Sequence, residues 1–206
     1  DLQEKFQTAG IEVKNSNLGQ LPETTWFHYP SDYLGDIVHS LNVRSDNLYA
    51  ESVLRLLSLS DHEKGSAEKG IDIIRKYWQN YEADSLELFM YDGSGLARNN
   101  KVSAKYLNCV LKETARDSLI GEYFVQTLPL AGKEGSVATF MKHGELPGEL
   151  RLKSGSMSDV HAYAGYYTTP QNRYAIVVMI NNYTCTRAQL KQKISTLLTQ
   201  VLSKKE

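Results

Sequence analysis

Two short runs of polar residues stand about half the chain apart and carry groups that can move protons and bind anions. The first run is Ser45-Asp46-Asn47, and the second is Lys153-Ser154-Gly155. A serine hydroxyl both donates and accepts hydrogen bonds, and a lysine sets a positive potential. A glycine allows a second backbone to approach closely. Each run also has a purely structural interpretation, the first as a helix cap and the second as a strand-end turn.

Hydrophobic spacing predicts the elements that position these two runs. Helices are predicted over about 31–41 with Ser31 as the cap, 46–57, 66–81 and 102–116, and an amphipathic helix is predicted at the end of the chain, around 190–201. Strands are predicted over 86–91, 150–153, 160–168 and 174–181. Pro170-Gln171-Asn172 favours a hairpin turn between the last two strands. Helices followed by a meander of strands and a terminal helix indicate an α+β fold with an antiparallel sheet.

The beginning of the chain differs in pattern from the rest. Residues 1–9 are predicted to be the end of a helix that Gly10 stops, and 11–13 a short strand. Residues 15–22 are rich in Asn, Ser and Gly, which is typical of a linker. The chain starts without an initiator Met, a basic start or an apolar signal core, so we expect either a processed end or a cut inside a longer protein.

Composition excludes several classes of protein. The 206 residues are 41% apolar, 23% charged and carry a net charge of -1, which argues against disorder and gives no basic surplus for nucleic-acid binding. The longest apolar run, 175–180, is far too short for a membrane helix. Neither a zinc-ligand spacing nor a phosphate-binding glycine loop occurs, so no metal or organic cofactor is predicted. Cys109 and Cys185 allow either one disulfide or two thiols.

The order and the surroundings of the two runs carry a family resemblance. Penicillin-binding proteins and serine β-lactamases carry Ser-x-Asn as their second motif and Lys-Thr-Gly as their third. In this chain Ser154 replaces the threonine and keeps its hydroxyl. The matching blocks are 44–51, 92–98 with Ala97 in place of the usual Ser, 129–136, and 153–157 followed by 164–166. Over about residues 6–183 the chain resembles the D-alanyl-D-alanine carboxypeptidase/endopeptidase family of low-molecular-mass penicillin-binding proteins.

This resemblance implies a β-lactamase/transpeptidase-like fold, an antiparallel sheet flanked by helices. Residues 23–206 would form the C-terminal part of the catalytic domain, and 1–22 the tail of an inserted domain with its linker. The family's first motif, Ser-x-x-Lys, holds the nucleophile and precedes the Ser-x-Asn motif. The one match here, Ser66 to Lys69, follows Ser45, and its pattern indicates a helix cap. We therefore expect the nucleophile to lie outside these 206 residues and the chain alone to be inactive.

The resemblance also implies a role for each candidate residue. Ser45 would relay a proton to the leaving amine, Asn47 would hold a substrate amide, and Lys153 would attract the substrate carboxylate. Ser154 would bind that carboxylate, Gly155 would give the backbone access, and Ser156 N–H would donate to an oxyanion. The edge of this strand would also pair with an extended peptide. Arg98 and Met157 would border a pocket for a stem-peptide side chain, although a solvent-facing Arg and a core Met explain them equally well.

The activity implied is hydrolysis through a serine acyl-enzyme at the D-alanyl-D-alanine end of peptidoglycan stem peptides. β-Lactams would acylate the same site, no cofactor is needed, and no nucleic-acid partner is expected. The substrate places the protein in the periplasm or cell envelope, where peripheral membrane or cell-wall association would be possible. One alternative is a non-catalytic module that binds peptidoglycan peptides on the same fold. A β-lactamase or esterase is a more distant alternative, against which the blocks at 92 and 129 argue.

Overall fold

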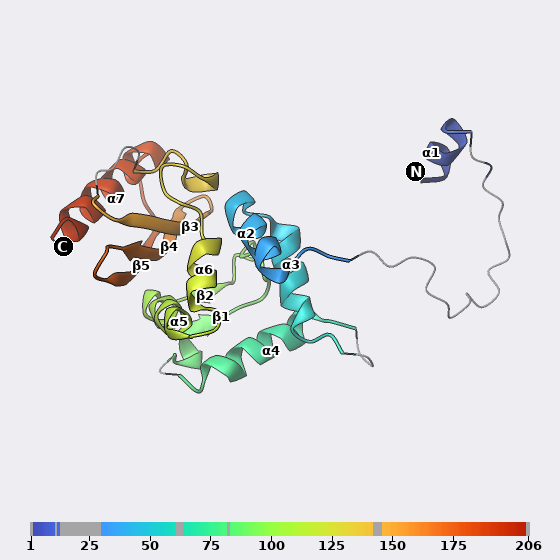
Figure 1. Ribbon diagram of the computed structural model, residues 1–206, viewed down its shortest axis with the longest axis horizontal. Coiled ribbons are helices and arrows are strands. Elements are labelled where there is room, and N and C mark those ends of the chain that lie inside the picture. Colours follow the sequence, from blue (N-terminus) through green and yellow to red (C-terminus); the bar gives the residue numbers. More distant parts are fainter. Residues whose placement is uncertain are drawn as a thin grey trace. The chain divides into compact units, whose positions relative to one another are not determined.

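The computed structural model describes residues 2–10, 12, 30–60, 64–81, 83–141 and 146–204 (Figure 1). Contacts divide the chain into two units, Asp1–Ser31 and Asp32–Glu206. In the first unit α1 spans Leu2–Thr8, and Gly10 follows it with φ +73°, as predicted for a helix stop. The predicted strand over 11–13 and the predicted linker over 15–22 lie outside the described residues, except for residue 12. The domain boundary placed after residue 22 therefore stays a prediction.

The second unit combines helices with two antiparallel sheets. Its helices are α2 (Leu34–Arg44), α3 (Asn47–Leu56), α4 (Ala67–Trp78), α5 (Ala104–Arg116), α6 (Gly121–Thr127) and α7 (Arg187–Leu202). Two 3₁₀ turns are η1 (Ser85–Glu87) and η2 (Gly135–Val137). The strands are β1 (Leu88–Phe89), β2 (Lys101–Val102), β3 (Glu149–Ser156), β4 (Val160–Thr168) and β5 (Arg173–Asn181). This is the α+β arrangement that the pattern of elements predicts.

The larger sheet has the order β3-β4-β5, and helices cover both of its faces (Figure 1). Its register aligns Lys153 with Ala164 and Ala164 with Val177. The predicted turn closes the β4–β5 hairpin, because Thr169 N–H donates to the Asn172 carbonyl at 2.8 Å. Successive side chains of a strand point to opposite faces, so each strand contributes to two separate cores.

One core lies between the sheet and α7. Leu190, Ile194 and Leu198 repeat at helical spacing and pack, all buried, against Leu152 and Tyr163 of the sheet. Burying a side chain of this size stabilises the fold by about 1.5–3 kcal/mol. The terminal helix is therefore an integral part of the unit that carries the sheet.

The other core lies between the sheet and helices α5 and α6, and it does not fill the whole face. Tyr166 of β4 is buried against Leu111 and donates its hydroxyl to the Leu111 carbonyl at 2.7 Å. Two and four residues earlier on the same face stand Ala164 and Ala162, which have only a methyl group to contribute. The change from tyrosine to alanine leaves a hollow at the start of β4, which lies beside the end of β3.

Several predicted element boundaries are wrong for identifiable reasons. Ser31 does not cap α2: the helix begins at Leu34 after Tyr33, whose side chain makes no capping bond. The predicted strand over 86–91 is only β1, because its partner β2 is equally short. The predicted helix from 102 begins at Ala104, where Ser103 accepts a capping bond from Tyr106 N–H.

Cys109 and Cys185 lie in different clusters, which settles the two alternatives for them. Cys109 packs against the cluster that contains Tyr106, and Cys185 packs against the α7 core. Both are half-buried thiols, not partners in a disulfide. Within the part of the chain that the structure describes, no helix is both long and apolar enough to cross a bilayer.

Candidate active site

A cavity of about 620 Å³ opens where the loop between α2 and α3 meets the end of β3. Its walls include most of the residues that the two motifs single out. They are Ser45, Asp46, Asn47, Lys153, Ser154, Gly155, Ser156 and Met157, together with Gly93, Gly95, Ser136, Ala162 and Ala164 among others. Residues more than a hundred positions apart in the chain therefore share one hollow.

Ser45 occupies the sharp reversal between α2 and α3. It is the C-cap of α2 and adopts the left-handed conformation, with φ 55° and ψ 50°, which is uncommon for a residue other than glycine. Asp46 then caps α3, because its carboxylate accepts a bond from Tyr49 N–H at 3.0 Å. The capping interpretation thus holds for Asp46, and the same turn presents Ser45 and Asn47 to the cavity.

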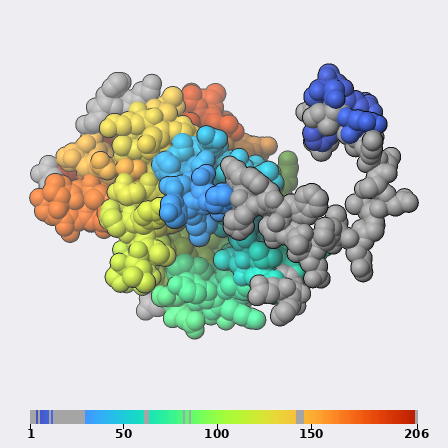
Figure 2. Space-filling view, turned by 45° about the vertical axis from the view of Figure 1, so that its right-hand side comes forward, coloured from blue at the N-terminus to red at the C-terminus, as the bar shows by residue number. Residues whose placement is uncertain are grey.

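Buried contacts fix the end of α2 against α6 and η2. Asn42 donates its amide to the Thr127 hydroxyl at 3.1 Å, and both side chains are buried. Gly135 of η2 lies so close to α2 that an added Cβ would stand 2.2 Å from the Val43 carbonyl oxygen. Figure 2 shows the light-blue residues of α2 lying directly against the yellow ones of α6 and η2. Ser45 therefore sits at the end of a helix that is held firmly in place.

Lys153 joins the two motifs directly. Its ammonium donates to the Ser45 hydroxyl at 2.8 Å and to the Ser154 carbonyl at 2.7 Å. The side chain is half-buried, and this burial lowers the pKa of Lys153 from its ordinary value of 10.5 because the charged form loses hydration. A cation and a hydroxyl in contact at a cavity wall can pass a proton and hold an anion.

The pKa shift predicts how stability depends on pH. An unfolded chain keeps the ordinary lysine pKa, so between the lowered value and 10.5 the unfolded state binds more protons, and stability rises with pH. Below the lowered value both states are protonated, and the cost of burying the charge is fully present. We expect Lys153→Met to lack this pH-dependent gain: between pH 7 and pH 10, wild type should gain melting temperature relative to Lys153→Met.

The control for this comparison is Lys112→Met, which removes an exposed lysine from α5. The difference in melting temperature between wild type and Lys112→Met should not change in this way between pH 7 and pH 10. If the difference in melting temperature between wild type and Lys153→Met stays constant, or shifts in favour of the variant as pH rises, the result would contradict the burial of this charge.

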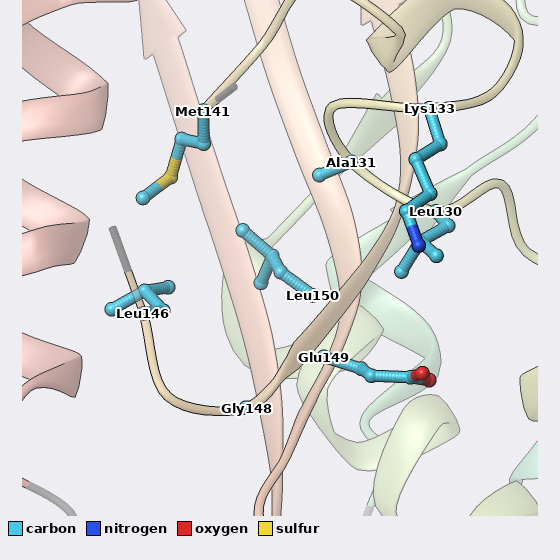
Figure 3. A pocket seen from close by; sticks show the side chains of 8 residues that line it. All are labelled: Leu130, Ala131, Lys133, Met141, Leu146, Gly148, Glu149 and Leu150. Carbon is cyan, nitrogen blue, oxygen red and sulfur yellow. The ribbon is translucent and has the colours of Figure 1, made fainter. Parts of the chain in front are cut away.

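The outer edge of β3 is covered along its first half and open along its second. Leu152 N–H donates to the Pro129 carbonyl at 3.0 Å, and Ala131 N–H donates to the Leu150 carbonyl at 2.8 Å. Figure 3 shows Ala131 and Leu130 beside Leu150 in this covered half. The pocket drawn there, about 200 Å³, has a mainly apolar lining with Lys133 and Glu149 as its charged members.

Among the described residues this pairing stops at Leu152, and the strand continues to Ser156. In an antiparallel ladder alternate residues turn their main-chain groups to opposite sides. The main-chain N–H and C=O groups of Leu150 and Leu152 point away from β4. Those of Ser154 and Ser156 must therefore point the same way. The N–H of Ser156 therefore points to the open edge at the cavity.

Arg98 and Met157 belong to an adjoining cavity of about 590 Å³. Met157 is half-buried and borders both cavities, whereas Arg98 is exposed and lines the second alone. The interpretation of Met157 as a core residue is therefore wrong. The two cavities share glycines of the loop and of β3, so a ligand can extend from one into the other.

Glu51 and Asp92 fix the loop between the two cavities, a role that was not predicted for them. One carboxylate oxygen of Glu51 accepts bonds from the N–H groups of Gly93 and Ser94, both at 3.0 Å. Asp92 accepts from Gly95 N–H and Ala97 N–H at 2.7 and 2.6 Å. The sequence signal for both was present, because they stand in the blocks that carry the family resemblance.

Ser66 caps α4, as its sequence pattern predicts. Its hydroxyl accepts a bond from Lys69 N–H at 3.2 Å, and its main chain is bound to the Ser58 hydroxyl. The cavity walls come from other segments, among them the α2–α3 turn, the loop after Asp92, η2, β3 and β4.

Comparison with known proteins identifies the class to which this fold and site belong. Residues 1–204 match the model of the D-Ala-D-Ala carboxypeptidase 3 (S13) family, and the chain belongs to this family. The resemblance seen in the motif blocks is thereby confirmed. The chain spans less than half of the length of the curated relatives that it matches.

Individual relatives agree with this assignment. The D-alanyl-D-alanine carboxypeptidase DacB of Haemophilus influenzae is 27% identical over 96% of this chain and 42% of its own length. The crystal structure of penicillin binding protein 4 (dacB) from the same organism, complexed with a β-lactam, is 23% identical and covers 98% of this chain and 49% of that one, with a TM-score of 0.74. An extended spectrum β-lactamase, TLA-1 S70G, is 14% identical, covering 82% and 64%, with a TM-score of 0.58. The β-lactamase/transpeptidase-like fold is thus confirmed.

Proposed function

We propose that this chain forms part of a serine-type D-alanyl-D-alanine carboxypeptidase/endopeptidase that acts on peptidoglycan stem peptides and binds β-lactams. The observation that carries the proposal is the contact between Lys153 and Ser45 beside the open edge of β3, in a chain that belongs to the S13 family. The structure of its relative in complex with a β-lactam supports the same ligand class. A peptidoglycan substrate places the protein in the cell envelope.

The proposed reaction passes through an acyl-enzyme. A serine hydroxyl supplied from outside these 206 residues attacks the carbonyl of the penultimate D-alanine, its Oγ–C bond forms, and the C–N bond to the terminal residue breaks. The Ser45 hydroxyl takes up the proton that the attacking serine releases and passes its own proton to the departing amine, and Lys153 holds that hydroxyl in place. Water then hydrolyses the ester and releases the shortened peptide.

The remaining residues bind the substrate and the charge that develops on it. Ser156 N–H at the open edge donates to the oxyanion, and Asn47 holds a peptide group of the substrate. Ser154 and the positive charge of Lys153 bind the terminal carboxylate. The extended peptide lies along the open half of β3, and its side chain enters the cavity that Arg98 and Met157 border.

A non-catalytic module that binds peptidoglycan peptides is the second candidate. The observation in its favour is that the Ser66–Lys69 match caps a helix instead of lining the cavity. Labelling of the whole protein by a fluorescent penicillin separates the two candidates. We expect a covalent adduct on a serine outside these residues, and none on this chain alone. An adduct on Ser66, or no adduct on the whole protein, would overturn the proposal.

Gly155 provides a test of ligand access that leaves the fold intact. A Cβ added at Gly155 would meet no atom within 4 Å, so the fold tolerates Gly155→Ala. A ligand that pairs with the edge of β3 would meet this methyl group. We expect the variant to melt within about 1 °C of wild type, which corresponds to a change in stability of only ~0.2 kcal/mol. Penicillin acylation should slow by about tenfold, which corresponds to about 1.4 kcal/mol in activation free energy.

Gly135→Ala is the matched comparison, because there the added Cβ meets the Val43 oxygen and φ is +51°. This variant should lose about 1–3 kcal/mol of stability. If Gly155→Ala acylates at the wild-type rate, the ligand does not approach along this edge. If it melts early, the added methyl group does not fit the fold as the open space around Gly155 predicts.

A further inference from the structure

Ser136 contributes a second hydroxyl to the cavity beside that of Ser154. The two oxygens lie 2.6 Å apart, which is a short hydrogen bond in which either hydroxyl can donate. Both residues line the cavity that contains Ser45 and Lys153. The contact joins side chains from η2 and β3, and the two residues are eighteen positions apart in the chain.

The backbone around Ser136 is fixed on both sides, so the contact is a built feature of the site. Gly135 packs against the Val43 carbonyl of α2 in a conformation that favours glycine. Gly132 N–H donates to the Val137 carbonyl at 3.0 Å, and Ala131 N–H donates to β3. The turn that carries Ser136 is therefore tied to the helix that presents Ser45 and to the strand that presents Ser154.

Two hydroxyls in contact share one hydrogen bond and keep one proton for another acceptor. A carboxylate accepts hydrogen bonds and donates none, so it selects the arrangement in which Ser136 donates to Ser154 and Ser154 donates into the cavity. A hydroxyl that accepts one bond becomes a stronger donor in the next. A carboxamide lacks the charge and gains less from this arrangement.

We propose that Ser136 is a positioning residue for the recognition of the substrate's terminal carboxylate, acting through the Ser154 hydroxyl. The inference rests on the proposed function, because it assigns a part of that same site. It makes Ser136 a determinant of the preference for a free C-terminal carboxylate over a blocked one. Lys153 supplies the charge, and the serine pair supplies the directed proton.

The test uses the whole native protein with two peptides, one ending in D-Ala-D-Ala and one in its C-terminal amide. The measured quantity is the ratio of kcat/KM for the acid to kcat/KM for the amide. We expect Ser136→Ala to lower this ratio by about 10- to 100-fold, the range for a hydrogen bond to a charged group. Ser136→Thr, which keeps the hydroxyl, should restore most of the ratio. Ser52→Ala, which removes an exposed hydroxyl that binds within α3, should leave it unchanged.

The outcomes separate this inference from the proposed function. If Ser136→Ala lowers kcat/KM equally for both peptides, or changes neither value while wild type is active, the ratio is unchanged. Ser136 then does not position the carboxylate donor, and the proposed function stands. If wild type hydrolyses neither peptide and takes no penicillin label, the proposed function fails and the inference falls with it.

Discussion

Lys153→Met is expected to slow acylation of the whole protein by a fluorescent penicillin by about 10²–10⁴-fold, the range for loss of a positioned proton-transfer group. Two functions are removed at once. The ammonium that donates to the Ser45 hydroxyl at 2.8 Å is lost, so the hydroxyl is no longer oriented. The positive charge at the cavity wall, which we propose attracts the substrate carboxylate, is lost as well.

The measurement is the second-order rate constant of labelling, read from a time course on gels. Lys153→Arg distinguishes the two functions, because it keeps a charge but cannot reproduce the compact ammonium contact. We expect Lys153→Arg to fall between wild type and Lys153→Met. Lys112→Met on the exposed face of α5 should label at the wild-type rate. A Lys153→Met variant that folds and labels at the wild-type rate would remove Lys153 from the mechanism.

β4 and β5 were predictable because their residues report their environment directly, whereas the strand predicted over 150–153 continues to Ser156 as β3. β4 begins and ends where the sequence places it, at Val160 and Thr168, and β5 begins only one residue earlier, at Arg173. These strands are covered on both faces, so nearly every position carries an apolar or small residue. The burial pattern is therefore visible in the residues themselves.

The short elements around the cavity were not predictable in the same way. α6 and η2 are seven and three residues long, too short for a periodic pattern to show. They form because Asn42 bonds to Thr127 and because Gly135 fits against α2, contacts between segments far apart in the chain. For that reason the role of Ser136 emerges only from the structure.

The site itself was predictable as a set of residues but not as a geometry. Motif order indicated that Ser45, Asn47 and Lys153 act together, while the contact between Lys153 and Ser45 depends on how α2 and β3 meet. The open half of β3 depends on where the segment around Pro129 stops pairing. The roles of the site residues remain proposals that the substitutions described here test.

Ser45→Gly is expected to raise stability while reducing acylation by about 10²–10⁴-fold, the range for a lost proton relay. Ser45 holds φ at 55°, a conformation that costs an L-residue about 1–2 kcal/mol and costs glycine almost nothing. The protein retains a serine there although glycine suits the turn better. The proton relay that we propose for the Ser45 hydroxyl would account for a strained serine at the end of α2.

The comparison of Ser45→Gly with Ser45→Ala isolates the two effects. Both variants lose the hydroxyl and its bond from Lys153, so both should label slowly. Only glycine relieves the backbone, so the melting temperatures should rank Ser45→Gly highest and Ser45→Ala lowest, with wild type between them. If Ser45→Gly were less stable than Ser45→Ala, the left-handed backbone would not be the source of the cost. If both variants labelled at the wild-type rate, the Ser45 hydroxyl would not be needed for acylation. The strained backbone at Ser45 would then have no connection with proton transfer.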